Sequence, residues 1–315
     1  MINRIKNKIK KLKLKIHIIL REEYGNKEIL EKNNKEKKKI YLKKVICNPI
    51  KIPIGLIKKR FNIEYIEIVL TTTCTLKCKG CSALMEHYKK QSHTNIDINI
   101  ESLKKILDCC DTLQHLRLLG GEPLCYPDLF KILEFTKQQD KIKRITIVTN
   151  GTLLIKDKQI LEILKNDKFD VFISNYGSFS RKKEELINEL RENNIKYKLN
   201  EEDILWRDYG NLEFRNRSKK ELKNQFLNCK VTCNSLYNGK LHHCPRSTHG
   251  TNLKKIPLKE QDYINVLDKN ITKKQLRKKL YKFFYGYVPY IEACNYCNSA
   301  TKDLKSMPAG QQSKK

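Results

Sequence analysis

The feature that most constrains this chain is a group of three cysteines, Cys74, Cys78 and Cys81, in the arrangement Cys-x3-Cys-x2-Cys. The group follows an apolar run that is typical of a β-strand. Three thiolates this close in sequence can hold three corners of a cubane [4Fe–4S] cluster. No fourth cysteine follows within two dozen residues, so one iron would keep an open site for a small molecule. A structural zinc site would take a fourth protein ligand, which makes zinc the less favoured alternative.

The length and composition of the chain indicate an enzyme-sized protein of a reducing compartment. Its 315 residues are enough for one large domain with an appendage. Its 12 cysteines would suit a disulfide framework only in a short secreted chain. The basic N-terminus is not followed by the apolar segment and cleavage site of a signal peptide, and no window reaches the roughly 18 apolar residues of a membrane span. We therefore expect a cytoplasmic protein whose thiols bind metal.

The formal net charge of +30 at pH 7 is extreme. Such a charge can attract nucleic acid or an anionic membrane surface, and a metal-stabilised protein that binds one of them is the non-enzyme alternative. Lysines occur throughout the chain, and alternating basic and aromatic runs for base stacking are not evident. We therefore expect the lysines to cover solvated faces, and we do not expect nucleic acid as a partner.

Residues 1–60 differ from the rest of the chain because they are dense in lysine. An amphipathic candidate at 5–20 would give weak contact with an anionic membrane surface. The alternative, which we favour, is a loosely attached basic extension. Pro49 and Pro53 indicate a break in regular secondary structure just before the main domain.

From residue 61 onward, apolar β-branched runs alternate with segments of helical periodicity. Strands are expected at 65–70, 115–119, 144–149, 171–174 and 197–199, and helices at 100–110, 127–139, 159–166 and 181–193. Repeated βα units of this length imply a parallel sheet covered by helices. The candidate motifs follow strand ends, which is where parallel α/β folds build their sites.

Two segments resemble the radical S-adenosylmethionine (SAM) superfamily. The stretch 70–81 resembles its cluster loop, and Gly-Gly-Glu-Pro at 120–123 resembles its second motif. The resemblance implies an α/β fold, a partial (β/α)6 barrel with a cluster at its mouth, followed by a small C-terminal iron–sulfur domain. We accordingly expect the barrel at 61–205, the second domain at 206–303 and a flexible tail at 304–315.

The same resemblance assigns contacts to SAM around the second motif. The carbonyl groups of Gly120 and Gly121, together with Glu122, would bind the SAM ammonium group. Glycine also lets the backbone approach a ligand closely. A simple tight turn is the alternative interpretation.

Asn150 and Ser174 end two successive strands. By position they resemble the family's polar contacts to the ribose and methionyl parts of SAM, and strand-end capping is the alternative. The family often has an aromatic residue just before the third cysteine, which stacks on adenine. Gly80 stands there in this chain, so the adenine contact must come from elsewhere.

A second set of four cysteines lies in the C-terminal third of the chain: Cys229, Cys244, Cys294 and Cys297. An Asn-Gly pair at 238–239, between two β-like runs, predicts a hairpin between the first two. The set resembles the C-terminal SPASM domain in its shorter, twitch form, which implies an auxiliary [4Fe–4S] cluster. A four-cysteine zinc ribbon is the alternative. Cys233 is the alternative ligand to Cys229.

Two further groups of residues complete the candidates. The remaining cysteines have no ligand-like grouping and are expected to be ordinary buried thiols: Cys47, Cys109, Cys110 and Cys125. Six polar residues around the second domain are candidates for a substrate base or an anion clamp: Arg207, Asp208, Tyr209, His243, Arg246 and His249. Each of these residue types is more often a surface or structural residue.

The resemblance implies reductive cleavage of SAM to a 5′-deoxyadenosyl radical, which abstracts hydrogen from a substrate. An auxiliary cluster with all its protein ligands would accept the substrate's electron, so the predicted reaction is oxidation (dehydrogenation) of a small-molecule or sugar-like substrate. Redox-neutral epimerisation, with a cysteine returning hydrogen, and peptide modification are the alternatives. An electron donor such as flavodoxin or ferredoxin is the expected partner. The sequence does not identify the substrate, because a fold does not fix a function.

Overall fold

The computed structural model describes residues 61–200, 204–231, 233–286 and 288–313. All of them belong to one compact unit, Gly55–Lys315. The basic extension expected at 1–60, its amphipathic segment and Cys47 lie outside the described residues.

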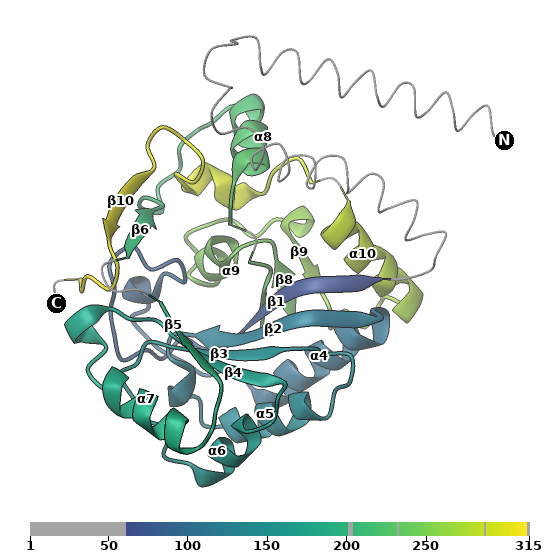
Figure 1. Ribbon diagram of the computed structural model, residues 1–315. Helices are drawn as coiled ribbons and strands as arrows, with labels where there is room; N and C mark the ends of the chain where they lie inside the picture. Colours follow the sequence, from purple (N-terminus) through teal and green to yellow (C-terminus); the bar gives the residue numbers. More distant parts are fainter. Residues whose placement is uncertain (1–60, 201–203, 232, 287, 314–315) are drawn as a thin grey trace, which may run out of the picture. The chain divides into compact units, whose positions relative to one another are not determined.

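Five parallel strands form the centre of the described structure (Figure 1). They are β1 (Asn62–Thr71), β2 (Thr112–Gly120), β3 (Ile145–Thr149), β4 (Phe169–Ile173) and β5 (Tyr197–Leu199). They lie side by side in the order β5-β4-β3-β2-β1. Because all five run in the same direction, their carboxyl ends meet at one rim of the sheet.

Each of the first four strands is followed by a helix, and Figure 1 shows these helices along one side of the sheet. They are α4 (Ile96–Cys109), α5 (Leu129–Lys137), α6 (Lys158–Leu164) and α7 (Lys183–Glu192). Asn95 caps α4 by accepting hydrogen bonds from the N–H groups of Asp97 and Ile98, which satisfies donors that have no partner within the helix.

Strand residues alternate between two environments, as the pleat of a sheet requires. On β1, Ile66, Ile68 and Leu70 are fully buried and belong to the main apolar core with the helices. The residues between them, such as Tyr65 and Glu67, point to the opposite side. We call the side of the sheet away from α4–α7 the inner face.

Three more strands extend the same sheet beyond β1. β7 (Ser235–Tyr237) pairs with β1 in parallel, and β8 (Lys240–His242) and β9 (Tyr263–Asn265) follow antiparallel. The hairpin expected at 238–239 connects β7 to β8. Both of its turn residues have positive φ, 46° at Asn238 and 75° at Gly239, which is the geometry that an Asn-Gly turn favours. The expected domain boundary near residue 205 therefore falls inside one compact unit.

The rest of the C-terminal region contains helices and a small separate sheet. The helices are α8 (Lys219–Asn228), α9 (Pro245–Asn252) and α10 (Lys273–Tyr285). The short 3-10 helices are η3 (Met85–His87), η4 (Pro123–Cys125), η5 (Gly177–Phe179), η6 (Glu260–Asp262) and η7 (Glu292–Tyr296). β6 (Leu205–Asp208) does not continue the main sheet after β5 but pairs antiparallel with β10 (Lys305–Pro308).

The predicted fold class is confirmed: the protein is α/β, with a parallel sheet that forms a partial barrel. The segment 304–315 was expected to be a flexible tail, but its described residues are paired with other parts of the protein. Residues 305–308 form β10, and residues 311–313 hydrogen bond to the cysteine loop after β1. Pairing with β6 satisfies the backbone groups of this segment. The Pro, Gly, Gln and Ser composition of the segment does not indicate this pairing.

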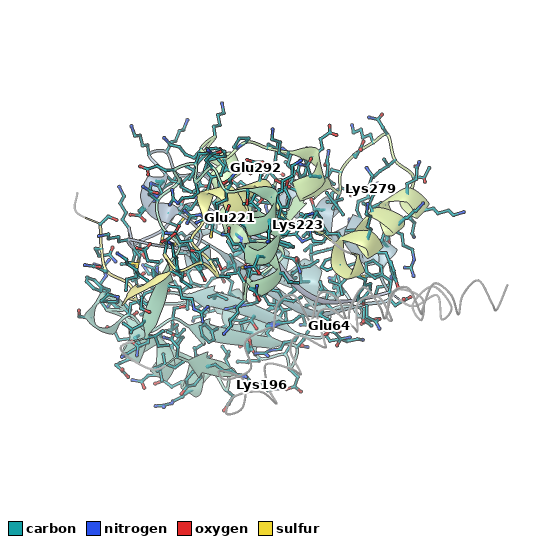
Figure 2. The ribbon with its side chains drawn as sticks, turned by 90° about the horizontal axis from the view of Figure 1, so that it is seen from above. Glu64, Lys196, Glu221, Lys223, Lys279 and Glu292 are labelled. Carbon is teal, nitrogen blue, oxygen red and sulfur yellow. The ribbon has the colours of Figure 1, made fainter. Side chains whose placement is uncertain are left out.

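Charged side chains of both signs are spread over the described surface. In Figure 2, Lys196 just before β5, Lys223 of α8 and Lys279 of α10 lie apart from one another, and Glu64, Glu221 and Glu292 lie among them. This distribution agrees with lysines on solvated faces. Within the described ranges, no helix has the length and apolar character needed to cross a membrane.

Candidate active site

The loop that follows β1 carries the first cysteine group. Hydrogen bonds join the two ends of this loop. Thr72 donates its backbone N–H to Ser92 O at 2.8 Å, and its side chain accepts the N–H of Ser92 at 2.9 Å. Thr71 bonds through its hydroxyl group to His93 Nδ1 at 2.9 Å. Cys74, Cys78 and Cys81 therefore extend from a closed loop at the carboxyl rim of the sheet.

Each of these three thiols accepts N–H groups from its surroundings. Cys74 Sγ lies 3.5 Å from Leu76 N and 3.7 Å from Asn150 Nδ2. Cys78 Sγ accepts from Gln312 Nε2 at 3.3 Å. Cys81 accepts from the backbone N–H groups of residues 83–85. Such donors favour thiolate over thiol.

Burial acts against these hydrogen bonds in the metal-free chain. It raises the pKa of Cys74 to about 12 and that of Cys78 to about 11. It also raises the pKa of Cys81. Buried thiols that are surrounded by N–H donors suit a metal centre, because coordination to metal deprotonates a thiol.

Tyr176, which follows β4, shows that the three thiols face a common region. Burial raises the pKa of its phenol, and the charges of Cys81, Cys78 and Cys74 each raise it further. Its ring also packs edge-on against Trp206, with 5.3 Å between ring centroids. The sequence analysis missed Tyr176, although its place two residues after a predicted strand end was the available signal.

The Gly-Gly segment ends β2 in close contact with the cysteine loop. Gly121 N donates to Thr71 O, and Glu122 N donates to Thr73 O, both at 2.8 Å. A Cβ atom on Gly120 or Gly121 would lie 2.2 Å from the carbonyl oxygen of Thr71 or Thr73. Only glycine allows this approach, so the segment has a stricter requirement than a simple tight turn.

Glu122 is fully buried and joins two strand ends. Its Oε2 accepts the N–H of Asn150 at 2.8 Å, and its Oε1 accepts the N–H of Leu124 at 3.1 Å. Burial raises the pKa of this carboxyl to about 7. Both oxygens thus already have backbone donors, and a SAM ammonium group would have to use their remaining lone pairs.

Asn150 and Ser174 lie at the same rim, after β3 and β4. Asn150 is nearly buried and turns its amide toward the cysteine loop, donating to Thr75 Oγ1 at 3.0 Å as well as to Cys74. Ser174 donates its backbone N–H to Thr149 O at 2.8 Å, and its side chain bonds to Tyr176. Strand-end capping alone does not explain the contact between Asn150 and a thiol from β1's loop.

The second cysteine set gathers from three separate elements. Cys229 ends α8, Cys244 caps the start of α9, and Cys294 and Cys297 lie at η7. Burial raises the pKa of Cys244 well above its usual value, and the charges of the other three thiols add to this. The four thiols are therefore neighbours in space.

Hydrogen-bond donors surround this set as well. Ser247 N donates to Cys244 Sγ at 3.4 Å, and Ser299 N donates to Cys297 Sγ at 3.3 Å. Cys229 Sγ lies 3.1 Å from Ser299 Oγ. Considering only the described residues, no three His, Cys, Asp or Glu side chains are arranged to hold a single metal ion.

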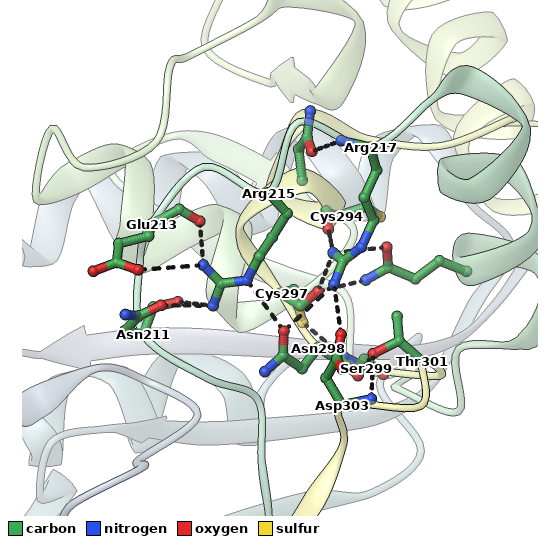
Figure 3. A network of polar contacts seen from close by, with 12 residues as sticks. Asn211, Glu213, Arg215, Arg217, Cys294, Cys297, Asn298, Ser299, Thr301 and Asp303 are labelled. Carbon is green, nitrogen blue, oxygen red and sulfur yellow. Dashed lines mark hydrogen bonds and ion pairs between the residues drawn. The ribbon is translucent and has the colours of Figure 1, made fainter.

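Two arginines adjoin the second set. Arg217 donates from Nη1 to the carbonyl oxygens of Cys294 and Cys297, at 3.0 and 2.6 Å (Figure 3). Arg246 is nearly buried, and its Nη2 donates to Gly210 O and Asn211 O, both at 2.6 Å. The positive charges of both arginines act to lower the pKa of Cys297, which burial raises.

Cys233 lies apart from this set, on the inner face of the sheet. Burial raises the pKa of its thiol to about 12, and its partner there is Glu67, with the charge of Arg117 nearby. Among the described cysteines, Cys229 rather than Cys233 adjoins Cys244, Cys294 and Cys297. Cys109 and Cys110 are buried, and Cys125 is half-buried.

The six candidate clamp residues do not meet in one cluster. Arg207 and Asp208 lie on β6 and pair with β10. His243 stacks on Phe283 with 3.7 Å between ring centroids, and burial lowers its pKa to about 4. The contacts of these three residues are those of structural residues.

The other three candidates lie closer to the cysteine sets. Arg246 was described above, and the charges of Cys229, Cys297 and Cys233 all act on Tyr209, whose pKa burial raises. His249 is fully buried, and its Nδ1 lies 2.9 Å from the hydroxyl group of Tyr88. Its Nε2 is buried without a hydrogen-bond partner.

A polar group on the inner face was not anticipated. Glu67 is 4% exposed in the middle of β1 and contacts the hydroxyl group of Tyr65. Arg117 of β2 lies 3.2 Å from the same hydroxyl and 3.9 Å from Glu67. The available signal was a carboxylate and a guanidinium near the middle of two strands, where each alternates with apolar residues, since buried charges need partners.

Comparison with known proteins identifies the central part of the chain. Residues 68–200 match the family model described as the Radical SAM superfamily. This part of the chain therefore matches a radical SAM domain, and the cofactors of that superfamily are a [4Fe–4S] cluster and SAM.

Two curated relatives are GTP 3′,8-cyclases. That of Clostridium acetobutylicum is 31% identical over 134 residues, which are 38% of this chain and 41% of that protein. That of Clostridium botulinum is 33% identical over 107 residues, which are 33% of this chain and 32% of that protein. The chain thus matches less than half of the length of these relatives.

Solved structures that are similar to this one include two complexes with AdoMet. BtrN in complex with AdoMet and 2-DOIA is 16% identical, with a TM-score of 0.47, and the match covers 76% of this chain and 94% of that one. Native anSMEcpe with bound AdoMet is 14% identical, with a TM-score of 0.46, covering 76% and 91%.

Proposed function

Because residues 68–200 match a radical SAM domain, we propose that this protein is a radical SAM enzyme that oxidises a small-molecule or sugar-like substrate. Cys74, Cys78 and Cys81 hold its [4Fe–4S] cluster. When bound, the cluster and SAM together supply the chemistry of reductive cleavage, which yields a 5′-deoxyadenosyl radical able to abstract substrate hydrogen. The observation that carries this proposal is the position of the three thiols on one loop at the carboxyl rim, where Asn150 and Gln312 donate N–H groups to Cys74 and Cys78 and the Gly-Gly segment packs against the loop.

The residues around the rim orient SAM. The close approach of Gly120 and Gly121 to the cysteine loop leaves backbone groups, rather than side chains, beside the loop that would hold the cluster. Asn150 has its amide beside Cys74 and supplies a polar contact to the cofactor, as does Ser174. Tyr176 provides the aromatic surface that Gly80 lacks.

The second set, Cys229, Cys244, Cys294 and Cys297, holds an auxiliary [4Fe–4S] cluster in a twitch-like region. A cluster held by these four thiolates would have no open site, and it would supply an acceptor for an electron from the substrate. Arg217 and Arg246 favour that role, because positive charge near a cluster favours its reduced state. Oxidation of the substrate is therefore the reaction that the arrangement favours.

The inner-face group of Tyr65, Glu67 and Arg117 binds the polar part of the substrate. Arg117 Nε is buried and has no hydrogen-bond partner. The hydroxyl group of Ser235 is also buried without a hydrogen-bond partner. Ser235 pairs with Glu67 across β7 and β1. Unused donors of this kind suit a hydroxylated ligand, since a site built for hydroxyl groups discriminates strongly against substrates that lack them.

The direct test is SAM cleavage. Anaerobically reconstituted protein, reduced with dithionite, is expected to convert SAM to 5′-deoxyadenosine and methionine. A reconstituted protein that holds iron and sulfide but forms no 5′-deoxyadenosine would overturn the proposal. A flavodoxin or ferredoxin is expected to replace dithionite, and an acidic donor would gain in rate from the positive charge of this chain.

A second candidate is redox-neutral epimerisation, and Cys233 is the observation that favours it. Its thiol is buried on the inner face, beside Glu67, and does not belong to the auxiliary set. A thiol there would return a hydrogen atom to a substrate radical, and the resulting sulfur radical would take one electron from the reduced electron donor and one proton from solvent. In D2O, epimerisation would place one deuterium in the product, and Cys233→Ser would abolish this incorporation; oxidation would place none.

A further inference from the structure

The chain returns to the first cysteine group at its C-terminal end. After β10, Gly310 turns the backbone with φ of 72°, and the next residues run antiparallel to the loop. Lys79 N donates to Gln311 O at 2.7 Å, and Ser313 N donates to Lys77 O at 2.8 Å. Two segments more than 200 residues apart in sequence are thus paired beside Cys78.

Gln312 uses both ends of its side-chain amide in this pairing. Its Oε1 accepts the N–H of Lys77 at 2.8 Å, and its Nε2 donates to Gly310 O at 2.6 Å. The same Nε2 lies 3.3 Å from Cys78 Sγ and donates to it. Because the oxygen is fixed by Lys77, the nitrogen is held in the direction of the thiol.

Glu86 makes a second connection between the loop and the C-terminal segment. Its Oε1 accepts the N–H of Gly80 at 2.8 Å, and its Oε2 accepts the hydroxyl group of Ser313 at 2.7 Å. The carboxylate thus ties Ser313 to the backbone two residues after Cys78. These contacts are independent of Gln312.

Two glycines make room for the segment. A Cβ atom on Gly80 would lie 2.4 Å from Met307 Sδ, so Met307 of β10 fills the space that a side chain at position 80 would occupy. A Cβ atom on Gly310 would lie 2.6 Å from Tyr176 Cβ. The segment therefore packs on both the loop and the aromatic residue that faces the three thiols.

We propose that residues 305–313 form a strap that completes the SAM-cluster site, and that Gln312 is a positioning residue whose N–H holds the Cys78 thiolate and raises the reduction potential of the bound cluster. This inference rests on the proposed function, because it assumes a cluster on Cys74, Cys78 and Cys81. A hydrogen bond to a ligand sulfur stabilises the more negative, reduced state of a cluster. The strap also keeps Cys78 away from solvent, at 6% exposure.

The first test measures the midpoint potential of the loop cluster by EPR-monitored redox titration. Gln312→Leu removes the donor, and Gln312→Glu replaces it with a carboxylate of the same shape. We expect the reduced-to-oxidised ratio at a fixed potential to fall about tenfold in Gln312→Leu, a shift of about 59 mV for one electron, and to fall further in Gln312→Glu. Gln311→Leu is the matched control, because the side chain of Gln311 is exposed and its backbone contact is kept.

The second test needs no cluster. In the metal-free chain, alkylation of Cys78 by iodoacetamide is followed by mass spectrometry, with Cys125 as the internal reference. A chain that ends at Leu304 lacks the strap, and we expect Cys78 in it to react about tenfold faster or more, because rates of modification follow access to the thiol. Gln312→Leu is expected to lie between this chain and the full-length protein.

The outcomes separate this inference from the proposed function. If the wild-type chain binds no [4Fe–4S] cluster on the loop, the proposed function fails, whereas faster alkylation without the strap still supports the contact itself. If the cluster forms and both Gln312 variants keep the wild-type potential, the positioning role of Gln312 is wrong. Equal alkylation of Cys78 with and without residues 305–313 would overturn the strap.

Discussion

The two cysteine sets differ in how the chain brings them together. Cys74, Cys78 and Cys81 lie on one loop at the end of β1, whereas the second set combines the end of α8, the start of α9 and η7. The loop set needs help from outside to be enclosed, and it receives an amide from Asn150 and another from Gln312. The loop set offers three thiols and the second set four, so only the loop set would leave one iron of a cubane cluster without a protein ligand.

The two sets also differ in the charges beside them. The carboxylates of Glu122 and Glu86 raise the pKa of Cys74 and Cys78 beyond the effect of burial. Arg246 and Arg217 act in the opposite direction on Cys297, although the carboxylate of Asp262 raises the pKa of Cys294. Negative surroundings disfavour reduction of a cluster and positive surroundings favour it, so the two arginines make the second site better suited to receive an electron.

Loss of a loop ligand is expected to have the largest effect. Cys78→Ala should lower the yield of 5′-deoxyadenosine more than about a hundredfold, since losing even an outer-shell partner of a metal site costs about 10–100-fold. The assay uses reconstituted, dithionite-reduced protein. Cys125→Ala is the control and should keep the wild-type yield. An unchanged yield in Cys78→Ala would remove the loop from the mechanism.

Loss of the second set should separate cleavage of SAM from turnover of the substrate. Cys294→Ala with Cys297→Ala should keep 5′-deoxyadenosine formation without substrate, because these thiols belong to a different centre, but it should stop formation of an oxidised product. Closed four-cysteine sites often hold their region together, so circular dichroism and SAM cleavage first establish that the variant is folded. Normal product formation by the folded variant would make the second centre purely structural and would favour the epimerase.

Removing one arginine is expected to have a moderate effect. Arg217→Gln loses the hydrogen bonds to the carbonyl groups of Cys294 and Cys297, and it should lower the free energy of unfolding by about 1–3 kcal/mol. It should also lower the potential of the second cluster and leave that of the loop cluster unchanged. The matched control is Arg215→Gln, since Arg215 bonds to Asn211 and Asn298 instead. Equal shifts at both clusters would contradict the electrostatic contrast.

The smallest effect concerns the pH dependence of stability in the metal-free chain. Burial raises the pKa of Glu122 from 4.5 to about 7. The neutral carboxyl therefore stabilises the fold fully below pH 4.5, and this contribution is lost as pH rises toward 7, by at most about 3 kcal/mol. Glu122→Gln, which cannot ionise, should flatten this part of the curve of unfolding free energy against pH. Parallel curves for both proteins would show that Glu122 does not titrate in this range.

The sequence predicted the strands of the barrel well because each is an apolar run that ends at a short turn signal. The strand at 197–199 occurs where periodicity puts it. α9 was missed because its sequence, Pro-Arg-Ser-Thr-His-Gly-Thr-Asn, contains weak helix formers. Cys244 and Pro245 at its start stabilise it, together with packing in the C-terminal region.

The site was predictable where a motif is local and not where it is assembled from distant segments. The cysteine spacing and the Gly-Gly-Glu-Pro segment are read within a few residues. The contacts of Gln312 with Cys78, and of Arg217 with Cys294, join positions that are far apart in the chain. No periodicity within either segment encodes such contacts, because they depend on how β10 and η7 pack.

The central claim is that the chain holds two clusters of different kind, one open to SAM and one closed. The most direct measurement combines iron and sulfide analysis with EPR of the reduced protein before and after addition of SAM. The account predicts about eight iron and eight sulfide per chain, since each cubane cluster holds four of each, and two EPR signals of which only one changes with SAM. That signal should persist in the Cys294→Ala, Cys297→Ala variant. About four iron with one zinc, or a SAM response that disappears with Cys294 and Cys297, would contradict the account.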